Sequence, residues 1–435
     1  MSLRFKLLHR PMKSPLLLFL TLTFFSVQAQ RTIIHCGYLI DGKTNDVQSQ
    51  MTLTVDGDKI ISVVKGFSPR GQADTLIDLS KKTVMPGLID MHVHLEGETS
   101  KDQALERFTL NQADVAFRST VFAKRTLMAG FTTVRDLGGS GVNTALRNAI
   151  NRGLVVGPRI FSAGKSIATT GGHADPTNGY RKDIMGDPGP DDGVINSPEE
   201  ARKAVRQRYK DGSDLIKITA TGGVLSLAKD GSGPQFTDEE LKAIIETAND
   251  YGMHTAAHAH GPVGMKRAVL AGITTIEHGT LMTEEIMDLM KQKGTFFVPT
   301  LTAGKFVGEQ AKVPGYYHPL VTPKALAIGP QIQKTYSMAY KRGVKIAFGT
   351  DAGVYFHGEN AKEFALMVEG GMSPIEAIKA ATVVNAGILG MSDKIGTIEP
   401  GKIADLVATD ENPLQNIRTL ENVTFVMKEG IVYKK

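Results

Sequence analysis

Cysteine is nearly absent from this sequence. Among 435 residues there is one, Cys36, so the chain cannot form an intrachain disulfide or hold zinc through a cluster of cysteines. A transition metal in this protein would have to be bound by histidine and carboxylate side chains. Cys36 also lies beyond the cleavage point predicted below, which excludes lipid attachment of the kind found at the start of mature lipoproteins.

Long hydrophobic runs are also scarce. A single apolar run, residues 15–25 (PLLLFLTLTFF), follows a basic segment and precedes Ala29. The run is too short to span a bilayer, which takes about 20 apolar residues. This order is typical of a secretory signal peptide, so we expect residues 1–29 to be removed and the protein to be exported to the periplasm or the medium. An uncleaved anchor is the alternative, and either Met1 or Met12 can be the start.

No excess of charge of one sign is left in the mature chain. Lysine and arginine number 50 against 45 acidic residues, and four of the basic ones precede the apolar run. The remainder is nearly neutral and has no basic stripe with interleaved aromatic residues, so we expect no nucleic-acid partner. With 41% hydrophobic and 22% charged residues, the composition is that of a soluble globular protein with a large catalytic domain and a minor one.

What is present is a regular succession of short apolar segments. Residues 30–85 and 395–435 contain alternating runs separated by turn residues, which predicts a small β-sandwich built from both chain ends. Between them, residues 86–394 alternate strand-like and helical patterns. The eight strand-like segments are 84–92, 132–135, 159–163, 215–219, 254–258, 274–278, 295–299 and 344–349. This is the number that an α/β fold of the (β/α)8 TIM-barrel type requires.

Helix starts and one loop can also be predicted. Ser197 with Glu200, and Thr237 with Glu240, have the spacing of capping boxes. The segment 171–193 is rich in glycine, aspartate and proline, and we expect it to be an active-site loop.

Five residues stand at the ends of predicted strands. His92 and His94 are two apart, so their side chains point to the same side of a strand; such a pair alone is more often structural. His258, His278 and Asp351 end the fifth, sixth and eighth segments. Barrel enzymes place their chemistry at this end of the strands, so the whole set predicts a metal site.

Lys217 lies in the fourth segment and would be repelled by cations in its ammonium form. Its amine could react with carbon dioxide to give an anionic carbamate that bridges two metals. Alternatively, it could pair with Asp214 or Glu277. The residues alone leave both possibilities open.

Several motifs resemble the amidohydrolase superfamily. They are MPGLIDMHVH at 85–94, the strand-end histidines and aspartate, and GTIEPGKIADLV at 396–407. Within that superfamily, TTGGHAD at 169–175, TGGV at 221–224 and AHAHG at 257–261 are similar to the branch of zinc Xaa-Pro and Xaa-Arg dipeptidases and ochratoxin-hydrolysing amidases. The likeness spans essentially the whole mature chain.

The resemblance implies a binuclear centre of divalent metal ions, with zinc favoured. His92, His94 and Asp351 would hold the first metal, His258 and His278 the second, and carboxylated Lys217 would bridge them. A water or hydroxide would complete the bridge between the two metals. Metal coordination lowers the pKa of bound water, so hydroxide would be available at neutral pH. Asp351 would take its proton and pass it to the departing amine.

Residues that meet substrate are harder to identify. His173 in the glycine-rich loop is placed to contact substrate or the oxyanion, with a solvated loop histidine as the alternative. His260 stands where related amidases often carry tyrosine, and we expect it to contact a substrate carboxylate. Gly223, beside Gly222, allows close approach of backbone to ligand. We expect a solvated Arg181 and structural roles for His254, His318 and His357.

The leading hypothesis is hydrolysis of a C-terminal peptide or N-acyl amino-acid bond in a small-molecule substrate, with dipeptides such as Xaa-Pro tried first. One alternative is a mononuclear cyclic-amide hydrolase or deaminase of the imidazolonepropionase type, in which a bridging Lys217 would have no purpose. The other is a non-catalytic barrel that binds a partner, which would be expected to lack several ligands. The family resemblance also allows a homo-oligomer.

Overall fold

The computed structural model describes residues 30–228 and 231–435. The predicted signal peptide, residues 1–29, lies outside the described residues. Within the described part of the chain, none of the helices combines the length and the apolar character needed to cross a membrane.

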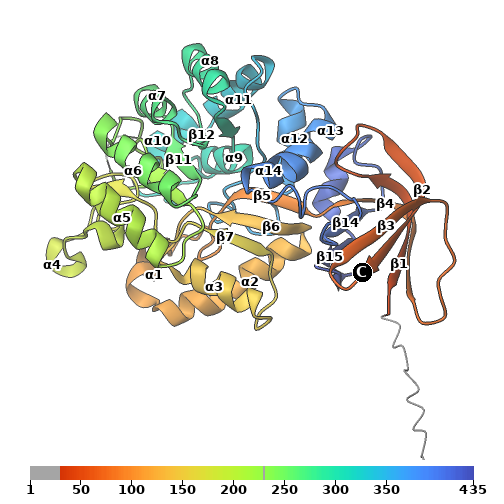
Figure 1. Cartoon of the computed structure of the whole chain (residues 1–435). Coiled ribbons are helices and arrows are strands. Elements are labelled where there is room, and N and C mark those ends of the chain that lie inside the picture. The colour runs from red at the N-terminus through yellow and green to blue at the C-terminus, as the bar shows by residue number, and fades with distance from the viewer. Residues whose placement is uncertain (1–29, 229–230) are drawn as a thin grey trace, which may run out of the picture.

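The two ends of the chain form one seven-stranded sheet at one end of the molecule (Figure 1). Its strands are β1 (Thr32–Ile40), β2 (Val47–Asp56), β3 (Lys59–Lys65), β4 (Thr75–Pro86), β14 (Leu406–Thr409), β15 (Phe425–Lys428) and β16 (Ile431–Lys434). The order is β16-β15-β14-β4-β1-β2-β3, and Val407 of β14 lies opposite Met85 of β4. The chain ends therefore pair with each other.

The sequence predicted a small β-sandwich built from both chain ends, and the structure joins the seven strands in one continuous sheet. Strand β4 is 12 residues long, so it pairs with β1 along one edge and with β14 along the other. The sheet wraps around a single core that contains Leu53 from one end of the chain and Phe425 from the other. A long shared strand thus makes the two halves continuous.

Seven parallel strands occupy the middle of the chain, in two sheets. They are β5 (Leu88–Val93), β6 (Phe131–Asp136) and β7 (Arg159–Ser162), then β10 (Ile216–Thr219), β11 (Thr255–Ala259), β12 (Thr275–His278) and β13 (Phe296–Val298). All seven overlap predicted strands. Nearly every residue of these strands is buried, as expected for parallel strands covered on both faces.

The eighth predicted segment, 344–349, is too irregular to form a strand but still connects the two sheets. Ala347 N donates to Phe297 O of β13 (2.9 Å), and Phe348 O accepts from Met91 N of β5 (3.0 Å). The other edges of the two sheets are β7 and β10, and there Asp214 N, just before β10, donates to Ser162 O of β7 (2.8 Å). Hydrogen bonds therefore join the two sheets at both edges.

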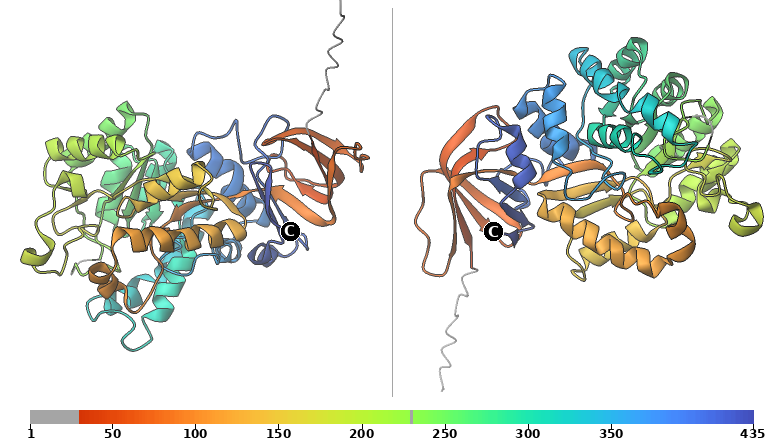
Figure 2. Two further views of the ribbon diagram at one scale, coloured as in Figure 1. Left: turned by 90° about the horizontal axis from the view of Figure 1, so that it is seen from below. Right: turned by 180° about the vertical axis from the view of Figure 1, so that it is seen from behind.

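Helices surround the parallel strands, and the terminal sheet lies to one side of them (Figure 2). The helices are α1 (Gln103–Thr109), α2 (Gln112–Met128), α3 (Val142–Asn151), α4 (Lys182–Met185), α5 (Pro198–Lys210), α6 (Asp238–Asp250), α7 (Pro262–Ala271), α8 (Glu284–Lys293), α9 (Leu301–Gln310), α10 (Thr322–Ile328), α11 (Gln331–Lys341), α12 (Lys362–Glu369), α13 (Pro374–Lys379) and α14 (Asn385–Ile388). Two short 3-10 helices, η1 (Pro190–Asp192) and η3 (Ile417–Asn422), a π-helical turn, η2 (Ala380–Val384), and the strand pair β8 (Ala168–Thr169) and β9 (Val194–Ile195) complete the fold.

Both predicted helix starts are present, with one difference. Thr237 forms a complete capping box with Glu240 at the start of α6. Ser197 caps α5 by accepting from Glu200 N (3.2 Å), but the Glu200 carboxylate accepts from Asn196 N (2.7 Å) and not from the cap residue. The extended backbone before the helix brings this neighbouring donor within reach.

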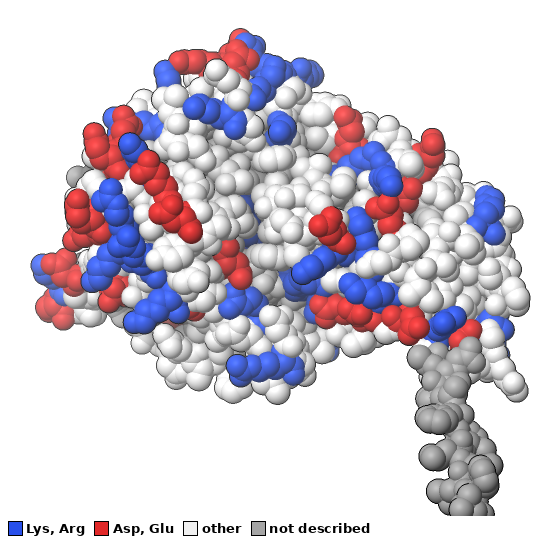
Figure 3. Space-filling view, viewed as in Figure 1, with Lys and Arg blue, Asp and Glu red and all other residues white. Residues whose placement is uncertain are grey.

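Charges on the surface are mixed. On the face shown in Figure 3, acidic and basic side chains are interspersed. Exposed pairs such as Arg342 Nη2 with Asp288 Oδ2 (2.7 Å) illustrate the pattern. This face therefore has no broad area of a single sign.

Candidate metal centre and active site

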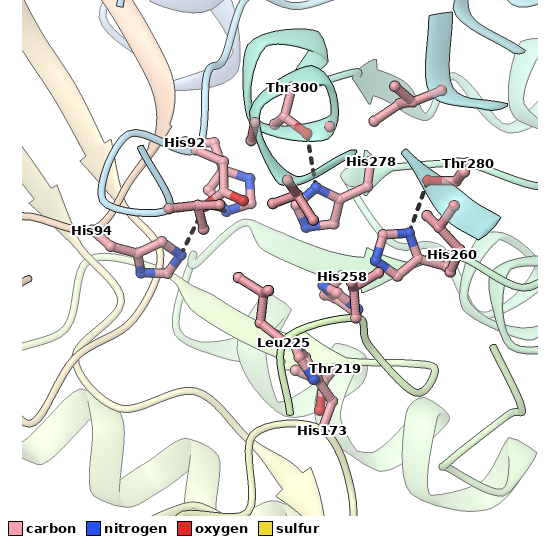
Figure 4. Close-up of a pocket in the computed structure, with 18 of the residues that line it drawn as sticks. His92, His94, His173, Thr219, Leu225, His258, His260, His278, Thr280 and Thr300 are labelled. Carbon is pink, nitrogen blue, oxygen red and sulfur yellow. Dashed lines mark hydrogen bonds and ion pairs between the residues drawn. The ribbon is translucent and has the colours of Figure 1, made fainter. Parts of the chain in front are cut away.

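The predicted ligand residues converge at the carboxyl ends of the parallel strands. His92, Lys217, His258 and His278 come from β5, β10, β11 and β12, while His94 and Asp351 follow β5 and the eighth segment. All six line one cavity of about 250 Å³, and Figure 4 labels the four histidines among them. The fold therefore brings together every residue that the sequence singled out as a ligand.

Three of these side chains aim lone pairs at one point. His92 Nδ1 donates to the Glu277 carboxylate (2.9 Å) and His94 Nδ1 donates to Gly138 O (2.9 Å). Because a carboxylate and a carbonyl can only accept, both rings must carry their proton on Nδ1. Each Nε2 therefore has a free lone pair, and each lies 3.4 Å from Asp351 Oδ1.

This arrangement of acceptors fits a metal cation. His92 Nε2 and Asp351 Oδ1 are buried and have no hydrogen-bond partner among the described residues. One donor atom each from His92, His278 and Asp351 lies within 4.8 Å of the others. Acceptors that face each other in a buried site are stable when a cation lies between them, and imidazole with carboxylate is a set that binds zinc and similar metals.

Burial keeps the imidazoles ready to bind a metal. It lowers the pKa of His94 to about 4 and the pKa of His92 and His278 well below the usual value, so the rings are neutral. Burial raises the pKa of Asp351 to about 8, against the lowering effect of Lys217. An ionised carboxylate at this position is therefore stabilised by positive charge beside it.

A buried ion pair fixes the ring of His92. Glu277 Oε2 accepts from His92, while Glu277 Oε1 accepts from Arg135 Nη2 (2.8 Å) and from the Thr275 hydroxyl. Arg135 and Glu277 are fully buried, and Arg135 Nε also donates to Met91 O (2.7 Å). The sequence did not predict this role, although a glutamate and an arginine inside buried strands are a signal that could have pointed to it.

The other half of the site contains His258, His278 and Lys217. His258 Nε2 donates to Gly222 O (3.2 Å), which leaves Nδ1 free, and His278 Nδ1 is hydrogen-bonded to Thr300 Oγ1 (2.8 Å). The two rings are in edge-to-face contact, with centroids 4.7 Å apart. Lys217 is buried, and burial lowers its pKa to about 8, against the raising effects of Glu277 and Asp351.

The predicted substrate residues lie beside this half. His173 lines the cavity and stacks on His258 with centroids 4.2 Å apart. Gly223 lies behind His173, where a Cβ atom would come within 2.2 Å of the ring, so glycine is required for His173 to occupy this place. His260 also lines the cavity, and its Nδ1 is hydrogen-bonded to Thr280 Oγ1 (2.8 Å).

The remaining candidates lie outside the cavity. Arg181 is exposed and pairs with Asp183, and His318 is exposed. His357 stacks on Phe122. His254 precedes β11 and therefore lies at the opposite end of that strand from His258.

The comparisons with known proteins agree with this geometry. The model of the amidohydrolase family matches residues 83–433. The chain belongs to the amidohydrolase family. Ochratoxinase from Aspergillus niger is 33% identical over 434 residues, which cover 94% of this chain and 87% of that protein.

Two solved structures share the fold of this amidohydrolase closely. A Xaa-Pro dipeptidase with bound methionine in the active site has a TM-score of 0.91 at 53% identity, covering 93% of this chain and 100% of that one. A prolidase complexed with N-methylphosphonate-L-proline has a TM-score of 0.85 at 31% identity, with coverage of 93% and 100%. With the family match, these relatives show that this amidohydrolase is an enzyme that hydrolyses amide bonds.

Backbone strain in this amidohydrolase is concentrated at the site. Five non-glycine residues among those described have a positive φ, and three of them are His278 (69°), Thr300 (52°) and Asp351 (61°). Such conformations cost about 1–3 kcal/mol each and persist where the surroundings enforce them. The strain turns these side chains toward the cavity at the points where the strands end.

The cavity of this amidohydrolase also has an apolar wall, which the sequence did not reveal. It is formed by side chains of α9, α10, α11 and the loops after β10 and the eighth segment, namely Val224, Leu225, Val307, Ile328, Ile332 and Val354. The wall faces the imidazole cluster, so a ligand would contact polar groups on one side and aliphatic groups on the other.

Proposed function

We propose that this amidohydrolase cleaves C-terminal peptide or N-acyl amino-acid bonds, with Xaa-Pro dipeptides as the first substrates to test. The observation that carries the proposal is the convergence of His92, His94 and Asp351 lone pairs on one buried point. We further propose that the eight segments form a closed (β/α)8 barrel, since hydrogen bonds join the two parallel sheets at both edges.

The proposed centre contains two divalent metal ions, with zinc as the first candidate. His92, His94 and Asp351 would hold one ion, and His258 Nδ1 with His278 would hold the other. Lys217, as a carbamate, would contribute an oxygen to each. Its burial supports this form, because a lowered pKa makes the neutral amine that reacts with carbon dioxide available near neutral pH.

Bound metal ions would supply a hydroxide near neutral pH and polarise the scissile carbonyl. Asp351 Oδ1 faces the centre of the site, so it can accept the proton of the attacking water and deliver it to the departing amine nitrogen. His173 and His260 lie beside the same space and can donate to substrate oxygens.

The substrate class follows from the relatives and the wall. The neighbouring structures contain methionine and a phosphonate derivative of proline. In this chain, the aliphatic lining that includes Val307 and Ile332 would suit an apolar side chain such as those of methionine and proline. Export would place such an enzyme where it can scavenge external peptides, and the apolar run at residues 15–25 supports export.

Metal analysis of the mature protein prepared in bicarbonate tests the centre directly. We expect close to two metals per chain, and a sharp loss in Lys217→Ala but not in Lys242→Ala, which alters an exposed lysine of α6. The wild-type protein should also release free amino acid from Xaa-Pro dipeptides. One metal in both the wild type and Lys217→Ala would contradict the carbamate and favour a mononuclear cyclic-amide hydrolase or deaminase.

A further inference from the structure

A carboxylate far along the chain from the predicted ligands is buried against the start of helix α9. Glu363 of α12 is fully buried. Its Oε1 accepts from Leu301 N (2.8 Å), and its Oε2 accepts from Thr302 N (2.8 Å) and from Thr302 Oγ1 (2.7 Å). None of the ion pairs found among the described residues involves Glu363. Burial raises the pKa of Glu363 to about 8, and the hydrogen bonds from Thr302 and Leu301 at the amino end of α9 act in the opposite direction, because they favour the ionised carboxylate.

The residue immediately before these amides is Thr300. It adopts φ of 52° and ψ of 48°, a left-handed conformation that a β-branched residue keeps only when its surroundings enforce it. Thr300 has no side-chain contact with the backbone of its own helix that would cap it. Its hydroxyl is instead hydrogen-bonded to His278 Nδ1 (2.8 Å), as the dashed line in Figure 4 shows.

These contacts form a continuous chain from α12 to a metal-binding atom. Glu363 holds the first two amides of α9, the start of α9 fixes the backbone of Thr300, and Thr300 fixes the orientation of the His278 ring. His278 itself has a positive φ of 69°, so its own backbone is strained in a similar way. A histidine ligand needs a partner on its other nitrogen to fix both the tautomer and the angle of the ring.

We propose that Glu363 is a positioning residue for the metal held by His258 and His278, acting through the start of α9 and the hydroxyl of Thr300. The inference rests on the binuclear centre proposed above. It assigns a role to a buried carboxylate that neither binds metal nor faces the cavity.

Zinc titration of the metal-depleted protein in bicarbonate, with a chromophoric chelator as competitor, tests the inference because it resolves two binding steps. Thr300→Val removes the hydroxyl and keeps the shape of the side chain. Glu363→Gln replaces one carboxylate oxygen by an NH2 group, which cannot accept, so one of the two backbone N–H groups of Leu301 and Thr302 loses its acceptor. In both variants we expect one and the same step to lose about 10- to 100-fold in affinity, with the other step within threefold of the wild type.

Two variants serve as matched controls. Thr300→Ser keeps the hydroxyl, and Glu359→Gln removes an exposed carboxylate just before α12 that pairs with Lys362. Both should bind zinc like the wild type. If Glu363→Gln does not fold, Thr300→Val decides the matter on its own.

The outcomes separate this inference from the proposed function. Two binding steps in the wild type and unchanged affinities in Thr300→Val and Glu363→Gln would overturn the positioning role and leave the binuclear centre intact. Equal weakening of both steps would also overturn it, because the effect would then not be specific to His278. A single binding step in the wild type would instead overturn the binuclear centre.

Discussion

The two halves of the candidate metal site are held in different ways. In the half with His92 and His94, each Nδ1 donates to a group that can only accept, the Glu277 carboxylate or the Gly138 carbonyl. In the other half, His278 Nδ1 meets the hydroxyl of Thr300, which can donate or accept. Both tautomers of the first half are therefore fixed. In the second half, the Gly222 carbonyl fixes the tautomer of His258, but that of His278 depends on how the Thr300 hydroxyl is oriented.

The two halves also differ in what lies behind them. Arg135 and Glu277 stiffen the first half from inside the parallel strands, where both are fully buried. The second half is supported by α9, whose side chains Ala303 and Val307 also line the substrate cavity. A ligand that presses on this wall would thus act on the helix that follows Thr300.

The largest expected effect comes from Asp351, which faces both imidazoles of the first half. Asp351→Asn keeps the size of the side chain but cannot accept a proton, so we expect kcat to fall by about 10³-fold or more. Steady-state hydrolysis of a dipeptide, with metal content measured on the same sample, checks this. A variant with full metal content and near-normal kcat would show that another group moves the proton.

Breaking the support of the first half should cost stability. Glu277→Gln leaves Arg135 buried without a charged partner, and we expect the metal-free protein to lose about 3–5 kcal/mol of unfolding free energy. Denaturant unfolding measures this loss. The matched control is Glu285→Gln, which breaks only an exposed pair with Lys266 and should not shift the midpoint measurably. Similar midpoints for both variants would contradict the stiffening role of the buried pair.

The pH dependence of metal binding should show whether the histidines, or Asp351 and Lys217, release protons when metal binds. Histidine ligands such as His94, with a pKa of about 4, are already neutral at pH 6. Burial raises the pKa of Asp351 and lowers the pKa of Lys217, both to about 8, so the pair holds at least one proton below pH 8 that metal binding must displace. Zinc affinity should therefore rise by at least about tenfold per pH unit from about pH 6 to 8 and then level off.

Competition titrations in a constant excess of bicarbonate at several pH values measure this slope. Lys217→Ala lacks one member of the pair, so the rise should move to a different pH range. A flat profile in the wild type between pH 6 and 8 would mean that the pair carries no displaceable proton.

The convergence of the six candidate ligands could be predicted from sequence because each lies in or just after a short apolar segment, and the carboxyl ends of parallel strands meet at one edge. The supports could not be predicted. Glu363 lies 62 residues from Leu301 and 61 from Thr302, whose amides it accepts from, and these residues meet only because α12 packs against α9. Hydrogen bonds between such distant residues leave no local pattern in the sequence.

The terminal sheet also could be predicted only in part. Alternating runs at both ends predicted strands that pair with each other, and β4 and β14 do so. The number of sheets depended on the length of β4, which continues from the pairing with β1 into the pairing with β14. Local alternation shows which residues face a core, but it does not show where a sheet is divided.

The smallest expected effect is on substrate preference, and it concerns the wall beside the second half. Ile332 is buried in α11 and lines the cavity. Ile332→Ala removes aliphatic surface that would contact an apolar substrate side chain, so kcat/KM for Met-Pro should fall about tenfold relative to Gly-Pro. Val263→Ala, on the exposed side of α7, is the control and should leave the ratio unchanged. An equal loss for both dipeptides would mean that Ile332 supports α9, because it also packs against Gly304, and that the wall does not select the side chain.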